Sequence, residues 1–535
     1  MISARIRQWQ IAPGVFNPRR VCLFLCVVLC PMSLPRETSA GLRAGVAKID
    51  ITDRDVPNPP EHLWAKALVL TDDSTSVVLI TVDAVAIGEI GPIKSGYLPT
   101  VRAALQQELQ IAPEQILVNA SHCHGIVCKD VAERTVEVVK QAWAKREPVR
   151  AGAGTGHENR VMENRRLYLK DGRQADVRHA YALPPDELVE RIGPIDPEIG
   201  ILRLDRLNGE TMAVVFNFAC HPIQGTPGTA GNTFDMTGYA AEVIENNLSE
   251  GTVALFLQGC AGDINPILYK DVSIPRHAEP LGNMLGLSTL KGVRRIVCRD
   301  VEQLSYSHST IELPRADHRE RIVKLQAEQD RLVQSLQGTS LNLKMFVPLL
   351  IKYKLSDDYP SYYSHGYLHD QMIGRDDWNR LDAENRRNLE QYIRNIHIME
   401  DLTRVKSNIA LLRRHQNRTE ELNASTVSAE VLGLKVGDFT LVTFPGELTV
   451  QIGLDIKQNA SHEHTFIVDT QMAICIMPPT DDQLSNPGCA GKTSDCLLVR
   501  LAATVSATGR EGSLGVVTPH EARQYHPPRG ILKVR

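Results

Sequence analysis

The chain has 535 residues and a formal net charge of −4, with 43% hydrophobic and 23% charged residues. This length allows several domains or one large domain with insertions, and the composition is that of a globular protein with a sizeable core. The weakly acidic balance, without a basic stripe in the interior, argues against a nucleic-acid partner.

The first 40 residues have the pattern of a secretory signal peptide. Arg19 and Arg20 precede an apolar run over Val21–Leu34, and Thr38–Ala40 supplies small residues where a signal peptidase would cut. The run is short for a membrane span. We therefore expect a secreted or periplasmic protein, with an uncleaved anchor as the alternative. Removing the five Arg and one Glu of this leader would change the net charge from −4 to −8.

Strand and helix patterns alternate from Gly41 to about Glu312. Ser76–Val82 is an apolar run typical of a buried strand, and Leu98–Gln110 and Val131–Ala144 have helical spacing. This order predicts an α/β fold with a mixed central sheet and flanking helices. The stretch Gly152–Asp196 shows little periodicity and predicts a long surface loop.

A different pattern, rich in helical spacing, covers residues 317–425. One helix is predicted around Ile322–Leu336 and a second around Leu389–Leu412, with Tyr-rich loop material between them over Tyr353–Tyr367. We expect this region to be a helical insertion. Strand character returns at Val427 and continues to about Val505.

Four predicted strands run directly into short polar motifs. These strand ends are Ile116–His124, Val214–Pro222, Leu255–Asp263 and Leu441–Glu447. Ligands of open α/β sheets bind just outside the carboxyl ends of strands, where loops bring distant residues together. Two ends that bear His and one that bears Glu provide the side chains of a three-ligand zinc site with an open fourth position.

Each of these side chains also has a simpler interpretation. His122 and His124 are two residues apart after a strand, so both imidazoles would project to one face; a pair of surface histidines is the alternative. His221, which precedes Pro222, could be an ordinary core histidine. Glu447 could instead cap a following helix, where a carboxylate is favoured by the helix dipole.

The third strand end continues into a tight loop, Gly259–Pro266, that contains two glycines. Such a loop can present backbone N–H groups to a developing oxyanion, or it can be a plain turn.

Cysteines adjoin several of these motifs. We interpret Cys123, Cys128, Cys220 and Cys260 as small buried hydrophobic residues rather than ligands. Cys489 and Cys496 lie close in the sequence and could pair in an exported protein.

Taken together, these segments resemble the catalytic domain of the neutral/alkaline non-lysosomal ceramidases, as a divergent bacterial-type member. The resemblance covers most of Gly41 to about Leu484. Its motifs are Ala44–Thr52, Asn119–Gly125, Asn164–Arg166, Gly193–Glu198, Ala219–Pro222, Asp235–Tyr239, Asp263–Pro266 and Pro445–Glu447.

The resemblance implies a Zn²⁺ ion held by His122, His221 and Glu447, and amide hydrolysis by a metal-activated water. It implies that His124 and an Arg of the Asn164–Arg166 motif bind and polarise the carbonyl. The expected catalytic residues are His124, Arg165, Arg166, Asp263 and Asn265.

Three features depart from the family pattern. Asn265 stands where the family has Ser, and a carboxamide can donate a hydrogen bond to an oxyanion but is a poor nucleophile. No Tyr occurs between Phe466 and Leu498, where the family has a Tyr that completes the zinc shell. The chain ends at Arg535, too early for the family's C-terminal immunoglobulin-like domain, so we expect residues 41–535 to form the catalytic domain without it.

The leading hypothesis is an exported zinc-dependent hydrolase of an N-acyl amide, with a small-molecule or lipid amide as substrate and peripheral membrane contact left open. The alternative is a catalytically impaired relative that serves as a secreted lipid- or glycan-binding protein. The three candidate ligands favour the enzyme, because a binding protein would not need them.

Overall fold

The structure is a computed structural model that describes residues 41–55, 61–88, 90–177, 183–225, 232–269, 271 and 273–470. The leader, the pair Cys489 and Cys496, the segment expected to carry the family's Tyr, and the predicted strands beyond Asp469 lie outside the described residues.

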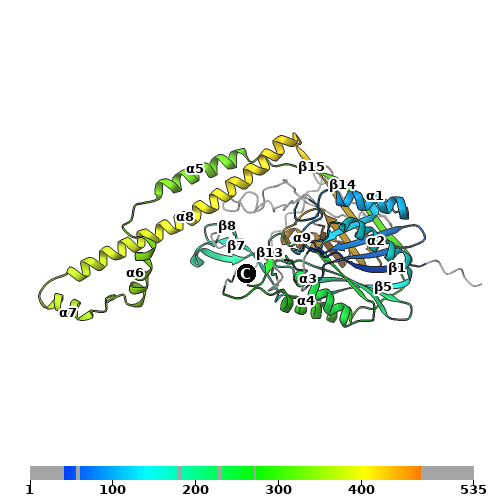
Figure 1. The fold of residues 1–535 in the computed structure, drawn as a ribbon, viewed down its shortest axis with the longest axis horizontal. Helices are drawn as coiled ribbons and strands as arrows, with labels where there is room; N and C mark the ends of the chain where they lie inside the picture. The colour runs from blue at the N-terminus through cyan, green and yellow to red at the C-terminus, as the bar shows by residue number, and fades with distance from the viewer. Residues whose placement is uncertain are drawn as a thin grey trace, which may run out of the picture. The chain divides into compact units, whose positions relative to one another are not determined.

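An eight-stranded mixed sheet, ordered β12-β11-β10-β5-β1-β2-β3-β4, forms the centre of the fold (Figure 1). The pairs β11/β12 and β3/β4 are parallel, and the other neighbours are antiparallel. Its strands are β1 (Arg43–Asp50), β2 (Trp64–Thr71), β3 (Ser76–Val82), β4 (Ile116–Ala120), β5 (Glu147–His157), β10 (Glu198–Arg206), β11 (Thr211–Phe218) and β12 (Val253–Gln258).

A second, four-stranded sheet packs against one face of the first. Its strands, in sheet order, are β14 (Leu304–Pro314), β15 (Thr426–Val436), β16 (Phe439–Phe444) and β17 (His464–Asp469). The alternation of side chains along β11 shows the layering. Ala213 and Val215 lie in the core between the two sheets, whereas Val214 and Phe216 lie in the core under helices.

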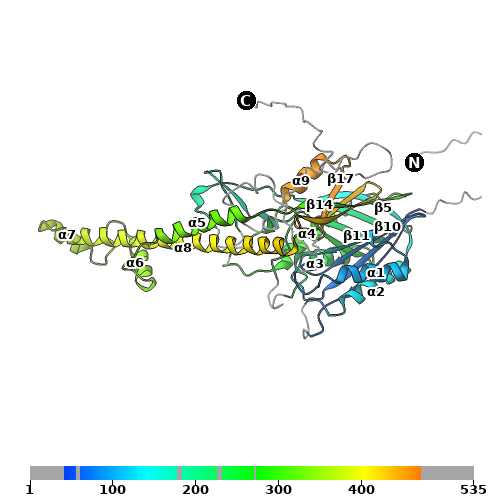
Figure 2. The same ribbon diagram turned by 90° about the horizontal axis from the view of Figure 1, so that it is seen from above.

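Helices cover the outer faces, which gives four layers. The helices α1 (Tyr97–Leu109) and α2 (Val131–Ala144) lie side by side over β1–β3. The helices α3 (Asp235–Asn246) and α4 (Ala278–Val293) pair in the same way over β10–β12 (Figures 1 and 2). The helix α9 (Val450–Asn459) packs on the outer face of the second sheet.

Side-chain amides bring distant strand ends together. The Asn119 Nδ2 donates to the Phe256 carbonyl at 3.1 Å, which joins β4 to β12, the two edge strands of the large sheet. The Asn217 Nδ2 donates to the carbonyls of Leu257 (3.1 Å) and Ile467 (3.0 Å), which joins both sheets. The carboxyl ends of β4, β11, β12 and β16 therefore meet in one region.

The long loop predicted over Gly152–Asp196 is not found for about half of its described residues, because β5 extends to His157 and four shorter strands follow it. The strand β6 (Met162–Asn164) pairs with β13 (Ile264–Pro266), and β7 (Arg166–Leu169) lies between β8 (Gln174–Asp176) and β9 (Val189–Ile192). Strands of three or four residues are too short to show a periodicity in the sequence. Short 3₁₀ turns are η1 (Pro113–Gln115) and η3 (Asp186–Leu188).

Four helices lie between β14 and β15: α5 (Arg319–Ser335), α6 (Leu343–Leu355), α7 (Ser364–Met372) and α8 (Asp377–Leu422). The helix α8 packs against each of the other three. The loop expected over Tyr353–Tyr367 is confirmed in its middle, over residues 356–363, and is wrong at both ends, where α6 extends to Leu355 and α7 begins at Ser364. Within the described residues, none of the helices combines the length and the apolar character needed to cross a bilayer.

The first residue of α3 is a buried carboxylic acid in the left-handed conformation, Asp235 (φ 52°). It accepts hydrogen bonds from the backbone N–H groups of Gly225 (2.6 Å) and Met236 (2.7 Å). Burial raises the pKa of Asp235 from its usual 3.8 to about 6, although these bonds oppose the shift.

We expect Asp235 to make the free energy of unfolding depend on pH. Between about pH 4 and pH 6 the folded chain keeps a proton that the unfolded chain has lost, so stability falls as pH rises through this window. In urea titrations with a metal chelator present, the wild type should lose on the order of 1 kcal/mol more than Asp235→Asn between pH 5 and pH 7. The exposed Asp73→Asn is the control and should follow the wild type. Equal slopes in Asp235→Asn and wild type would contradict the assignment.

Candidate metal centre

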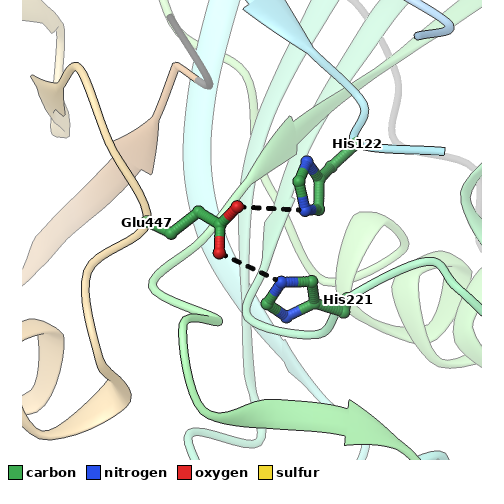
Figure 3. A group of neighbouring side chains, drawn as sticks. All are labelled: His122, His221 and Glu447. Carbon is green, nitrogen blue, oxygen red and sulfur yellow. Dashed lines mark ion pairs between the residues drawn. The ribbon is translucent and has the colours of Figure 1, made fainter. Parts of the chain in front are cut away.

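Three buried side chains from separate strand ends converge on one point (Figure 3). The Nε2 atoms of His122 and His221 each lie 3.5 Å from a different carboxylate oxygen of Glu447. One ligand atom from each residue can be chosen so that all three lie within 4.8 Å of one another. The convergence expected from the sequence is therefore present in the fold.

His122 owes its position to an unusual backbone conformation. The strand β4 ends at Ala120, and His122 has φ 67°, which is rare for a residue other than Gly. Its N–H donates to the Ala84 carbonyl at 3.0 Å, and its Nδ1 donates to the Val85 carbonyl at 2.6 Å. The segment after β3 thus orients the imidazole.

The shared face expected for His122 and His124 is not found. His122 is buried and His124 is exposed. The strand alternation on which the expectation rested has already ended, and the left-handed residue turns the chain between them.

His221 lies just beyond β11 and contacts one carbonyl twice. Both its backbone N–H (3.2 Å) and its Nδ1 (3.0 Å) donate to the Ile264 oxygen. This fixes the ring so that Nε2 points at Glu447. The side chain is buried, as a core histidine would be, but it faces a charged group rather than an apolar core.

Glu447 does not cap the helix that follows it. The N-cap of α9 is Thr449, and the Val450 N–H donates to the Asp263 carboxylate at 2.9 Å. The capping role belongs to Asp263, from a different segment. The carboxylate of Glu447, only 2% exposed, is directed at the two imidazoles.

This geometry has an electrostatic consequence. Carbonyl oxygens only accept hydrogen bonds, so the Nδ1 atoms of His122 and His221 must carry protons. In the neutral rings, the two Nε2 lone pairs then face a carboxylate across 3.5 Å. Lone pairs and a carboxylate repel one another unless a proton or a metal cation lies among them. A ring N–H donated to a backbone carbonyl is also the usual partner arrangement of a metal-bound histidine.

The Gly259–Pro266 loop is wedged between the segments that carry His221 and Glu447. A Cβ on Gly259 would lie 2.9 Å from the Phe218 carbonyl carbon, and one on Gly262 would lie 2.8 Å from the Glu447 backbone oxygen. Only glycine permits backbone contacts this close. The two glycines thus allow the loop to lie in backbone contact with the segments that carry His221 and Glu447.

Three backbone N–H groups of this loop donate to carbonyls within the protein. Gly259, Gly262 and Ile264 donate to the carbonyls of Phe218, Leu448 and Ala261, respectively. They are therefore not directed at a substrate oxyanion. The Asn265 Nδ2, by contrast, is buried and finds no hydrogen-bond acceptor among the described residues, while its Oδ1 accepts from Arg165 Nη1 at 3.4 Å. Asn265 is thus the better candidate donor.

Arg165 and Arg166 hold this loop. Arg165 forms an ion pair with Asp176 at 3.1 Å and donates to the Gly262 carbonyl, and Arg166 pairs with Asp263 at 3.4 Å. Both guanidinium groups are almost fully buried. Their contacts place them as positioning residues for the loop, and the carbonyl-binding role that the resemblance implies for one of them stays a prediction.

The sequence analysis did not identify Asp176 or Asp469. Asp469 ends β17 and accepts a hydrogen bond from the Leu448 N–H at 2.8 Å, next to Glu447. Burial raises the pKa of Asp469, and the nearby charge of Glu447 adds to the shift. Asp469 could have been found from the sequence, because Phe466–Asp469 is another apolar strand that ends in a polar residue. Asp176 follows no such pattern.

Burial disfavours the thiolate form of the cysteines around the centre. Burial raises the pKa of Cys123, Cys220 and Cys260 well above the usual value, and none of them forms a disulfide. A thiol must lose its proton to bind a metal. This agrees with their interpretation as packing residues.

No protein-family model matches the chain, and no curated protein matches it significantly. The neutral ceramidase from Pseudomonas aeruginosa is similar with a TM-score of 0.47 and 16% identity, over 78% of this chain and 64% of the ceramidase. A ceramidase complexed with C2 is similar with a TM-score of 0.51 and 16% identity, over 84% and 72% of the respective chains. This chain has the ceramidase fold. It spans less than two thirds of the length of the first ceramidase.

The ceramidase fold confirms the α/β class and the mixed sheet with flanking helices that the sequence predicted.

Proposed function

We propose that this protein is an exported, zinc-dependent hydrolase of an N-acyl amide, with a lipid amide as the substrate class. The convergence of His122, His221 and Glu447, with both imidazoles oriented by backbone carbonyls, carries the proposal. The ceramidase fold supports the choice of an amide substrate.

The ligand set fits zinc in particular. Two imidazole nitrogens and one carboxylate are the protein ligands of several catalytic zinc sites, which keep a fourth position open. Calcium and magnesium prefer sets made of oxygen atoms alone. A zinc ion at this position would supply a Lewis acid that polarises an amide carbonyl and lowers the pKa of water.

The chain's own residues supply the remaining functions. Val85 and Ile264 hold the imidazole rings through their carbonyls, so Nε2 presents a lone pair toward the centre. Asn265, oriented by Arg165, can donate its Nδ2 hydrogen bond to the oxyanion that forms when an amide carbonyl is attacked. His124, which is exposed, can bind the polar part of a substrate that approaches from solvent.

The proposal is tested by measuring zinc per chain and the hydrolysis of a panel of N-acyl amides, including N-acyl sphingoid bases. We expect about one zinc per chain and turnover of at least one amide. Glu447→Gln, which keeps the side-chain shape, should lose most of both, whereas the exposed Glu463→Gln should keep both. A zinc-loaded chain that hydrolyses no amide would favour the lipid- or glycan-binding alternative. A chain that binds no zinc would contradict the metal centre itself.

A further inference from the structure

The helix α6 is apolar on two faces, and the structure covers only one of them. Phe346 and Tyr353 are buried, and Leu349 and Leu350 are partly buried with them, in a small core shared with α8. Figure 1 shows the position of α6 beside α8. A helix that is apolar all round is normally covered all round, by protein or by lipid. The other face of α6 therefore needs an explanation.

That face carries a regular stripe of exposed aliphatic side chains at a spacing of four residues. Its members are Leu343 (64% exposed), Val347 (43%), Ile351 (54%) and Leu355 (82%). Residues four apart share one helix face, so the stripe runs for about 18 Å along α6. In water, this much aligned apolar surface is unfavourable without a partner.

Basic side chains accompany the stripe. Lys344, Lys352 and Lys354 all lie within α6, and the helix contains no Asp or Glu. Acidic residues begin only after its end, at Asp357 and Asp358. At 100° per residue, Lys344 and Lys354 fall among the stripe residues and Lys352 lies beside them. An apolar stripe interleaved with lysines, whose stems are apolar, matches the chemistry of a helix that lies in the plane of an anionic membrane surface.

The residues that follow α6 in sequence extend the same character. Twelve of the 26 exposed large hydrophobic side chains in the described part of the chain fall within residues 343–381. Beyond the stripe they include Tyr362 (95% exposed) and Tyr363, and amphipathic Tyr rings favour the membrane–water interface.

We propose that α6 is a membrane-docking helix that inserts its Leu343–Leu355 stripe into the interfacial region of an anionic phospholipid bilayer. A helix of 13 residues is about 20 Å long, which suits a position in the interface and is too short to span a bilayer. Lysine stems reach the lipid headgroups while the aliphatic stripe enters the acyl boundary. The inference does not rest on the proposed hydrolase activity, because binding to lipid requires no turnover.

The first experiment measures whether lipid covers the stripe residues. Hydroxyl-radical footprinting of the full chain, with and without phosphatidylglycerol vesicles, reports the solvent exposure of individual side chains. Leu355, Ile351 and Tyr362 should lose reactivity when vesicles are added, while the exposed Leu207 and Val297 should not change. Because it reads single residues, the experiment also distinguishes docking by α6 from attachment through the apolar leader. Unchanged reactivity of the stripe on vesicle-bound protein would overturn the proposal.

The second experiment measures vesicle affinity by co-sedimentation. Replacing all four stripe residues with Ser should weaken binding at least roughly tenfold, because each buried aliphatic side chain contributes to insertion. The matched control replaces four other exposed apolar residues, Leu207, Leu287, Val297 and Val323, with Ser and should bind as the wild type does. Each Lys→Gln change at Lys344, Lys352 or Lys354 should weaken binding about fivefold at low salt, and phosphatidylcholine vesicles should remove this difference.

The alternative occupant is a second copy of this chain. In that case the stripe would be protected from hydroxyl radicals without lipid, and the protection would increase with protein concentration. Such a result would overturn the membrane proposal. Turnover is not measured in either experiment, so a failure of the hydrolase proposal leaves these results interpretable.

Discussion

His221→Ala is expected to lose zinc binding and amide hydrolysis together while the fold is kept. The change removes one of the three converging ligands, and the remaining imidazole and carboxylate cannot hold zinc in its usual geometry. The loss of affinity should exceed the roughly 10- to 100-fold that is typical when only a partner of a ligand is removed. Zinc content after dialysis and hydrolysis of the best amide substrate are the measurements.

The matched control is His124→Ala. His124 is exposed and lies two residues from His122, so its loss should leave zinc content unchanged. The backbone N–H of residue 221 still donates to the Ile264 carbonyl in the Ala variant, which favours retention of the local fold. Circular dichroism and thermal unfolding check this. Stoichiometric zinc in a folded His221→Ala protein would remove His221 from the ligand set.

Asn265→Ala is expected to keep zinc but lose most turnover. A carboxamide does not attack an amide, so the contribution of Asn265 is the hydrogen bond that its Nδ2 can donate. Loss of one oxyanion donor typically costs on the order of 100- to 1000-fold in rate. The buried Nδ2, without an acceptor among the described residues, is the structural basis for this expectation.

Two further variants separate donation from packing. Asn265→Ser keeps a hydroxyl donor and should retain part of the rate. Asn265→Asp keeps the oxygen that accepts from Arg165 Nη1 but loses the donor, so it should be as slow as the Ala variant. Equal rates for wild type and Asn265→Ala, both loaded with zinc, would show that Asn265 has no such role.

The sequence was informative wherever an apolar strand ended in a polar residue. All four strands that were expected to lead into polar motifs are present, as β4, β11, β12 and β16, and three of the ends meet at one point. The relation between His122 and His124 could not be predicted, because it depends on one left-handed residue. A non-glycine residue in that conformation leaves no trace in composition or periodicity.

Two other errors have a common physical origin. Beyond the end of β5, the strands of Gly152–Asp196 are too short to show periodicity, and only the ends of Tyr353–Tyr367 belong to helices, α6 and α7. Hydrophobic periodicity identifies an element only when one face is buried and the other is not. The roles of Arg165, Arg166 and Asp263 in supporting the loop also required the fold, since their partners are distant in sequence.

The three candidate ligands come from both main sheets, so a bound metal ion would connect the two sheets. His122 and His221 follow strands of the eight-stranded sheet, whereas Glu447 follows a strand of the four-stranded sheet. An ion held by all three would be a cross-link between the layers, and separating the layers would require its release. By mass action, free zinc at 1,000 times its dissociation constant would add about 4 kcal/mol to the work of separating them. The availability of zinc would then determine how strongly the two packed sheets resist mechanical separation and proteolysis, independently of any catalysis.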